Sequence, residues 1–198
     1  MTSFTEKKFN IPELKGISAK NIEEHLKLYA GYVKNANTIL EKIEEYQKDS
    51  GANAYALGEL QRRFAFEFDG MRNHEYYFSS LEGGSTELDA GGNLAKEIIK
   101  TWGDVDTFLN MFKAIALTRG VGWAILYYDT QTKHLLTQWV DEQHLGHLTG
   151  LPWILGIDMW EHSFVYDYQP SGKKNYIEDF FANLNWSVIE KNFEEATK

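Results

Sequence analysis

The chain of 198 residues is 43% hydrophobic and 15% aromatic, so it can bury a sizeable core as one large domain or two small ones. It contains no cysteine, which excludes disulfides, thiolate zinc sites, iron–sulfur clusters and cysteine nucleophiles, so any metal must be held by nitrogen and oxygen. The formal net charge of −9 argues against a general nucleic-acid or anionic-membrane surface. Without a signal-peptide core or an apolar segment of roughly 18 residues, we expect a soluble cytoplasmic protein with no membrane partner.

The first half is predicted to form a helical hairpin. Ser18 is suited to cap a helix over about 18–49, in which apolar residues recur every three or four positions. Residues 51–53, Gly-Ala-Asn, supply a turn, and a second helix is predicted from about 54 to 81. Two long helices joined by a short turn pack as antiparallel neighbours.

A glycine-rich polar stretch, residues 81–93, follows the hairpin and is the best candidate for a domain boundary. We therefore expect an N-terminal helical-hairpin domain over residues 1–88 and a C-terminal α/β domain over residues 89–198.

The C-terminal part is predicted to combine helices and strands. Two shorter helices come first, at about 94–104 and 104–120. Three runs rich in aromatic and β-forming residues then predict strands, at 122–129, 134–141 and 151–158. Two helices, at about 174–184 and 186–196, close the chain. The order predicts an α+β fold, in which the long hairpin precedes a three-stranded antiparallel sheet flanked by helices.

Four side chains are candidate metal ligands. His25 lies inside the first predicted helix and His74 inside the second, while Asp158 ends the third predicted strand and His162 follows four residues later. The hairpin and the strand end can each offer two ligands, which predicts a site between the two domains. Three imidazoles and one carboxylate suit iron, manganese or zinc, whereas calcium and magnesium prefer oxygen. The alternative is that Asp158 and His162 form a structural hydrogen-bonded pair.

Gly70 lies one helical turn before His74, among several aromatic residues. A glycine inside a helix is less favourable than alanine by roughly 1 kcal/mol, so Gly70 is predicted to make room for a neighbouring group. Tyr32 follows His25 by seven residues, or two turns, so both side chains share one helix face.

Several motifs resemble one family in the order in which they occur there. The segment DMWEHSFVYDY at 158–168 resembles the D-x-W-E-H-x-Y-x-x-D-Y signature of the iron/manganese superoxide dismutases. Further segments resemble that family: GISAKNIEEH at 16–25, NH at 73–74, GVGWAIL at 120–126 and LNWSVIEKNF at 184–193. The resemblance covers nearly the whole chain. It implies an enzyme that converts superoxide to oxygen and hydrogen peroxide, with one iron or manganese ion per chain.

The resemblance also implies roles for individual residues. The metal ligands would be His25, His74, Asp158 and His162.

Other roles follow in the same way. Tyr32 would stand beside the metal-bound solvent, and Trp123 and Trp160 would form a hydrophobic wall. Glu161 would cross the interface of a homodimer to the partner subunit's His162, so the interface is expected around these two residues.

The chain departs from the family in the first helix and at the entrance to the site. The interval between His25 and Tyr32 is one residue shorter than usual, which leaves Glu24 as an alternative ligand, although the flanking motif favours His25. Leu28 and Val165 stand where the family usually has a histidine and a tyrosine that meet across the dimer. Their joint replacement puts the usual hydrogen-bonded access funnel in doubt, though not the metal site.

The residue that hydrogen-bonds the metal solvent in the family is usually a glutamine. In some members this glutamine comes from the second helix, where the corresponding residue in this chain is Gly70. The loop residues Gln143 and His144 are therefore the candidates for the hydrogen bond to the metal solvent. His144 is slightly favoured, because an imidazole spans a little more distance; the plain alternative is that both are polar loop residues. His134 and His147 are interpreted as surface residues.

Two other functions compete with dismutation. A mononuclear iron oxygenase typically uses two histidines and a carboxylate, so the third histidine argues against it. An inactive metal-binding scaffold would fit the altered funnel. Neither the choice between iron and manganese nor that between dimer and tetramer follows from the sequence.

Overall fold

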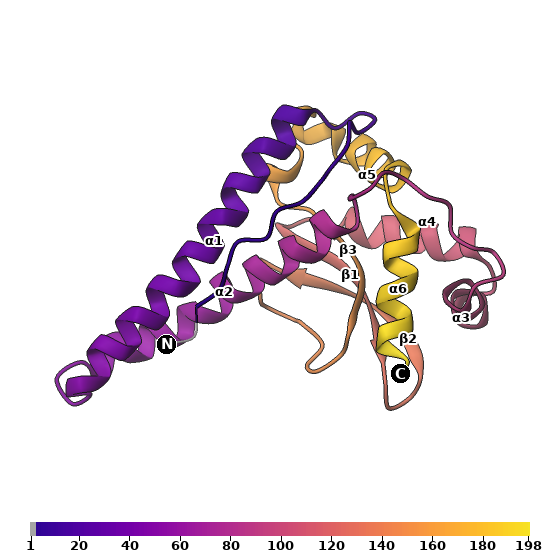
Figure 1. Ribbon diagram of the computed structural model, residues 1–198. Coiled ribbons are helices and arrows are strands. Elements are labelled where there is room, and N and C mark those ends of the chain that lie inside the picture. The colour runs from indigo at the N-terminus through magenta and orange to yellow at the C-terminus, as the bar shows by residue number, and fades with distance from the viewer. Residues whose placement is uncertain (1–2) are drawn as a thin grey trace.

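A computed structural model describes residues 3–198 of the chain (Figure 1). Helix α1 (Ala19–Tyr46) and helix α2 (Ala54–Ser79) lie side by side as a long hairpin, joined through a 3-10 turn, η1 (Gln47–Asp49). Ser18 caps α1, since its side chain accepts a hydrogen bond from the Asn21 N–H. The predicted hairpin is confirmed, with each helix ending two or three residues earlier than expected.

The remaining elements alternate as the sequence predicts, with two additional 3-10 turns. In chain order they are α3 (Asn93–Trp102), α4 (Val105–Ala116), β1 (Gly122–Asp129), β2 (His134–Asp141), β3 (Trp153–Asp158), η2 (Glu161–Ser163), η3 (Pro170–Gly172), α5 (Lys173–Ala182) and α6 (Trp186–Ala196). In the described range 3–198, no helix has both the length and the apolarity that crossing a bilayer would demand.

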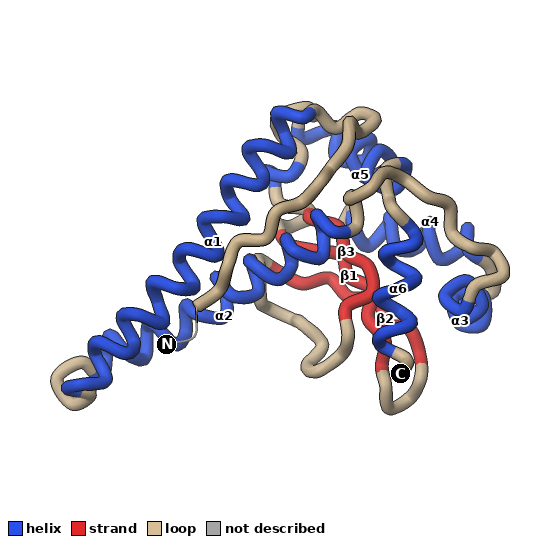
Figure 2. The backbone as a smooth tube through the Cα atoms, in the orientation of Figure 1, coloured by secondary structure: helices blue, strands red, loops and turns tan. Residues whose placement is uncertain are grey.

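The three strands form one antiparallel sheet in the order β2-β1-β3 (Figure 2). The central strand β1 and the strand β3 are buried, whereas β2 is partly exposed. In the register of the sheet, Trp123 of β1 lies opposite Asp158, the last residue of β3. The sheet therefore brings a large indole beside a carboxylate at the end of β3. The predicted α+β fold is confirmed.

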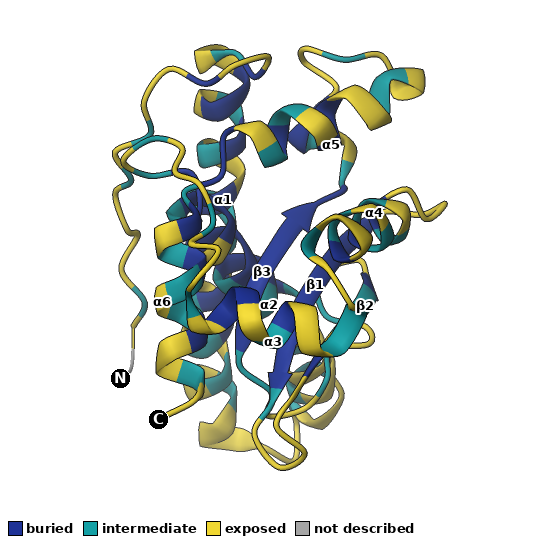
Figure 3. Cartoon of the chain, turned by 90° about the vertical axis from the view of Figure 1, so that its right-hand side faces the viewer, coloured by how far each residue is buried: buried dark blue, intermediate teal, exposed yellow. Residues whose placement is uncertain are grey.

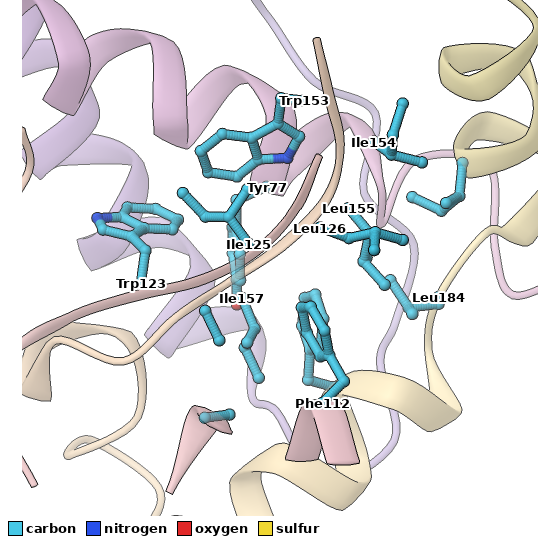
Figure 4. Packing of buried hydrophobic residues seen from close by; sticks show 14 of the residues in the cluster. Tyr77, Phe112, Trp123, Ile125, Leu126, Trp153, Ile154, Leu155, Ile157 and Leu184 are labelled. Carbon is cyan, nitrogen blue, oxygen red and sulfur yellow. The ribbon is translucent and has the colours of Figure 1, made fainter. Parts of the chain in front are cut away.

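Helices from both halves of the chain cover the sheet. Helices α2 and α6 contact β3, α3 contacts β2, and α4 contacts both β1 and β2. Viewed from the side, the dark blue buried strands β1 and β3 lie among helices whose outer faces are exposed (Figure 3). Figure 4 shows strand residues such as Ile125 and Leu155 in the same cluster as Tyr77 of α2 and Phe112 of α4. This shared core holds α2 rigidly against β3.

Candidate metal centre

Four side chains converge between the hairpin and the end of β3. His25 comes from α1, His74 from α2, and His162 from η2, while Asp158 ends β3. The Nε2 atoms of these three imidazoles lie 3.1, 3.5 and 3.2 Å from Asp158 Oδ2, respectively. One donor atom from each of the four residues lies within 4.8 Å of all the others. The arrangement has the compactness that a single metal ion requires.

The alternative ligand Glu24 lies outside this cluster. Its side chain is exposed and pairs with Lys20 and Lys27 on the same helix. His25, by contrast, is fully buried, and α1 continues through it as a regular helix without a bulge.

His74 presents an unprotonated nitrogen to the cluster. Its Nδ1 lies 2.6 Å from the Gly70 carbonyl, which only accepts hydrogen bonds, so Nδ1 carries the proton. The neutral ring therefore turns the lone pair of Nε2 towards the Asp158 carboxylate, and this buried Nε2 has no hydrogen-bond partner among the described residues. A lone pair facing a carboxylate is repelled unless a cation lies between them. The donor set and its orientation thus fit a metal ion.

The orientation of Asp158 is fixed from its own backbone side. The Trp160 N–H donates to Oδ1 at 2.8 Å, which leaves Oδ2 directed at the imidazoles. The Asp158 carbonyl accepts from the Ser163 hydroxyl and the Tyr176 hydroxyl, both at 2.9 Å. These bonds hold the 3-10 turn η2, which begins three residues after Asp158, close to the end of the strand.

The ionisation of the cluster suits metal binding. Burial lowers the pKa of His25, and burial together with the neighbouring His25 lowers the pKa of His74 to about 3. Burial alone would raise the pKa of Asp158, but the imidazoles of His162 and His25 hold that pKa below its ordinary value. Neutral imidazoles beside an ionised carboxylate are the protonation states that ligate metals.

A chain of hydrogen bonds runs beside the cluster through Gln143. The Gln143 Nε2 donates to the Tyr32 hydroxyl at 3.0 Å, and the Trp123 indole N–H donates to Gln143 Oε1 at 2.9 Å. The ring of Tyr32 packs against His74, with 5.1 Å between ring centroids. Gln143 and Trp123 are fully buried.

Of the two loop candidates, Gln143 and His144, Gln143 is the one that bonds Tyr32. His144 packs edge-on against Phe66, with 5.6 Å between ring centroids. The backbone accounts for the difference, because Glu142 has a left-handed conformation, φ +52°, which redirects the loop just before Gln143. Residue counting could not detect that turn.

Gly70 makes room for the ring of Tyr32. A Cβ atom added at Gly70 would lie 2.6 Å from Tyr32 Cδ1, closer than non-bonded carbon atoms approach. The prediction that this glycine accommodates a neighbour is confirmed.

The remaining predicted residues lie at the rim of the cluster. Trp160 is half-buried, stacks on the His162 ring at 5.6 Å between centroids, and donates its indole N–H to the Glu142 carbonyl. Glu161 is exposed, as are Leu28 and Val165, whose exposed fractions are 43% and 48%. The rim is therefore open where the sequence predicts a dimer interface.

Two supporting residues escaped the sequence analysis. Asn73 donates to the Gln143 carbonyl at 2.9 Å, and its position directly before His74 was the available signal. The second is His147, which was interpreted as a surface residue: it is half-buried, and its Nε2 lies 3.0 Å from the Gln143 carbonyl. The exposed His134 does lie on the surface.

Comparisons with known proteins agree with this geometry. Residues 90–192 match the family model for iron/manganese superoxide dismutases, C-terminal domain. The chain is 35% identical to the superoxide dismutase [Fe] of Aquifex aeolicus, over 93% of this chain and 88% of that protein. It is 34% identical to the superoxide dismutase [Mn] of Mycobacterium leprae, over 87% and 82% of the two chains. The superoxide dismutase [Mn/Fe] of Aeropyrum pernix is 33% identical, over 99% and 94%. On these similarities, which extend over most of each chain, the protein belongs to the iron/manganese superoxide dismutase family.

Proposed function

We propose that this protein is a superoxide dismutase that converts superoxide to oxygen and hydrogen peroxide at one iron or manganese ion per chain. The ligands are His25, His74, Asp158 and His162. The observation that carries the proposal is the convergence of three imidazole Nε2 atoms on Asp158 Oδ2, with the His74 proton held on the opposite nitrogen by Gly70. Family membership supports it independently.

A bound iron or manganese ion would supply one-electron redox chemistry between the +3 and +2 states, which dismutation requires because one superoxide is oxidised to oxygen and another is reduced to peroxide. The chain contributes one carboxylate and three neutral imidazoles to this centre. A single negative ligand leaves the site positive in both states, which attracts superoxide locally although the whole chain carries a net charge of −9.

Tyr32 is the proposed proton donor. Burial, and secondarily the charge of Asp158, raises the pKa of the Tyr32 hydroxyl well above its ordinary value, so it stays protonated at neutral pH. Because its oxygen accepts from Gln143 Nε2, its own hydrogen remains free to be donated. Peroxide formation consumes two protons, and this hydroxyl can deliver one of them. Trp123 and Trp160 limit the entry of other molecules around it.

We further propose a homodimer formed through the surface around Glu161 and His162. The exposed Glu161, the partly exposed side chain of His162 (19%) and the exposed apolar Leu28 and Val165 support this interface. Glu161 would there accept a hydrogen bond from the partner subunit's His162. The division into domains at residues 88 and 89 and the cytoplasmic location stay predictions.

The decisive test is reconstitution of the metal-free protein with iron and with manganese separately. Superoxide dismutation and metal content are then measured on the same samples, beside an Asp158→Asn variant. We expect activity with at least one metal at about one ion per chain, and little bound metal in the variant. Full metal occupancy without dismutation would overturn the function and favour an inactive scaffold or an oxygenase. Failure to bind either metal would overturn the four-ligand site.

A further inference from the structure

The loop between β2 and β3 carries Gln143 and, four residues later, His147. The imidazole of His147 lies between this loop and the strand β1, with Nε2 3.0 Å from the Gln143 carbonyl and Nδ1 2.5 Å from the Tyr127 hydroxyl. We propose that His147 is a positioning residue that fixes the Gln143 backbone and, through it, the amide that bonds Tyr32. The catalytic part of this inference rests on the proposed function.

The two partners of His147 determine which nitrogen carries its proton. The Gln143 carbonyl only accepts hydrogen bonds, so Nε2 must donate. In the neutral ring Nδ1 then accepts, and the Tyr127 hydroxyl is its donor. Burial raises the pKa of Tyr127 above its ordinary value, so the hydroxyl keeps the hydrogen that this bond requires. One imidazole thus ties the loop to the central strand of the sheet.

The Gln143 carbonyl is held from two directions. Asn73 donates to it at 2.9 Å from α2, and His147 donates to it from within the loop. The adjoining residue is held as well, since the Glu142 N–H donates to the Val121 carbonyl and the Glu142 carbonyl accepts from the Trp160 indole, both at 3.0 Å. The backbone pair between Asp141 and Leu145 closes the turn around Gln143. Among the side chains that hold Gln143 and Glu142, His147 alone lies on the loop itself, so its bond adds a side-chain restraint to the carbonyl inside that turn.

The side chain of Gln143 has little freedom to absorb a backbone shift. Its Oε1 must face Trp123, because an indole N–H only donates, and its Nε2 therefore faces Tyr32. The bond to Trp123 is buried and the bond to Tyr32 is partly buried, and they connect the loop to β1 and α1, so movement of the Gln143 carbonyl lengthens one or both. The loss of the His147 bond should therefore be detected at Trp123 and at Tyr32, although His147 contacts neither by a hydrogen bond.

Two amide substitutions separate the bonds that His147 makes. In His147→Gln the longer side chain brings an amide N–H to the place of Nε2 and can still donate to the carbonyl. In His147→Asn the shorter side chain reaches only the place of Nδ1 and leaves that carbonyl with Asn73 alone. His134→Asn is the control, since His134 is an exposed histidine at the start of β2.

The first readout is hydrogen exchange of the Trp123 indole N–H in the metal-free protein, assigned by its disappearance in Trp123→Phe. Loss of the net contribution of one neutral hydrogen bond corresponds to an increase in the exchange rate on the order of tenfold. We expect that increase in His147→Asn, and rates near wild type in His147→Gln and His134→Asn. Equal rates in the Asn and Gln variants, or unprotected Trp123 in a folded His147→Gln, would overturn the proposal.

The second readout is dismutation by the reconstituted variants at equal metal content. We expect His147→Asn to lower kcat by about tenfold, and His147→Gln to restore most of the activity. Exchange at Trp123 requires neither metal nor activity. An inactive wild-type protein would therefore overturn the proposed function, while the exchange rates would still decide whether His147 positions Gln143.

Discussion

Replacing Gly70 by alanine has two opposite effects on stability: a gain in helix propensity and a steric clash with Tyr32. An alanine in a helix interior is more favourable than glycine by about 1 kcal/mol. At Gly70, however, the new methyl group would lie 2.6 Å from Tyr32 Cδ1 and 2.7 Å from Cε1. Carbon atoms prefer a separation of about 3.5–4 Å, so the ring must move by roughly 1 Å. The rings of Phe66 and His74 pack on the Tyr32 ring, with centroids 5.9 and 5.1 Å away, so the Tyr32 ring has little room to move.

Overpacking of this kind destabilises a core by about 1–3 kcal/mol, and the helix-propensity gain offsets about 1 kcal/mol of that cost. The free energy of unfolding of Gly70→Ala should therefore be between unchanged and about 2 kcal/mol lower than that of the wild type. The matched control is Gly58→Ala in the same helix, where nothing lies within 4 Å of the added atom. That variant should be about 1 kcal/mol more stable than the wild type. Urea unfolding of the metal-free proteins, followed by circular dichroism, measures both changes.

The same displacement should break the bond from Gln143 to the Tyr32 hydroxyl. A shift of about 1 Å in a proton donor can lower a rate on the order of 10²-fold, so Gly70→Ala should lose most of its dismutase activity while retaining its metal. Gly58→Ala should keep full activity. If Gly70→Ala is stabilised as much as Gly58→Ala and remains fully active, the argument that Gly70 exists to accommodate Tyr32 is refuted.

Three further outcomes are expected. The metal-free protein should lose stability as the pH falls from about 6.5 towards 3. Burial lowers the pKa of His74 to about 3 in the folded protein, so the unfolded chain is protonated at this histidine at a higher pH than the folded one. Urea unfolding at several pH values across this window tests the prediction, and an equal loss of stability in His74→Gln would contradict it. Trp123→Phe should destabilise the protein by about 1–3 kcal/mol in the same assay, since Gln143 Oε1 loses its donor; an unchanged midpoint would show that the bond contributes nothing. Glu161→Ala should weaken both dimerisation, measured by sedimentation velocity, and metal retention during dialysis against a chelator; a variant that keeps both properties rules out the bridging role.

The elements that depend on local patterns could be predicted from the sequence. The hairpin follows from apolar residues three and four apart and from Ser18 as the N-cap, and the strands follow from short aromatic runs between turn residues. The 3-10 turns η2 and η3 could not be found in this way, because each is only three residues long and too short to show a periodic pattern. In η2, the Ser163 N–H donates to the Trp160 carbonyl, and the Ser163 hydroxyl donates to the Asp158 carbonyl.

Within the site, too, local patterns indicate some positions and not others. The His25, His74 and Asp158 positions follow from a motif with fixed spacing and from helix faces. The choice between Gln143 and His144 depends on the left-handed backbone at Glu142, which no composition rule specifies for a glutamate. The role of His147 was missed for a related reason. Its partners are a backbone carbonyl and the hydroxyl of Tyr127, and residue spacing predicts neither hydrogen bond.

The distance along the chain between the ligands has a consequence for how the metal is acquired. His25 and Asp158 are 133 residues apart in sequence, yet their side chains lie 3.1 Å apart in the fold. Contacts of such separation form late during folding, because closing a long loop is entropically unfavourable until other contacts support it. Neither the hairpin nor the segment after β3 offers more than two ligands by itself. The complete proposed site is therefore expected to exist only in the nearly folded chain, so that the assembled fold, and neither segment alone, selects and binds the ion.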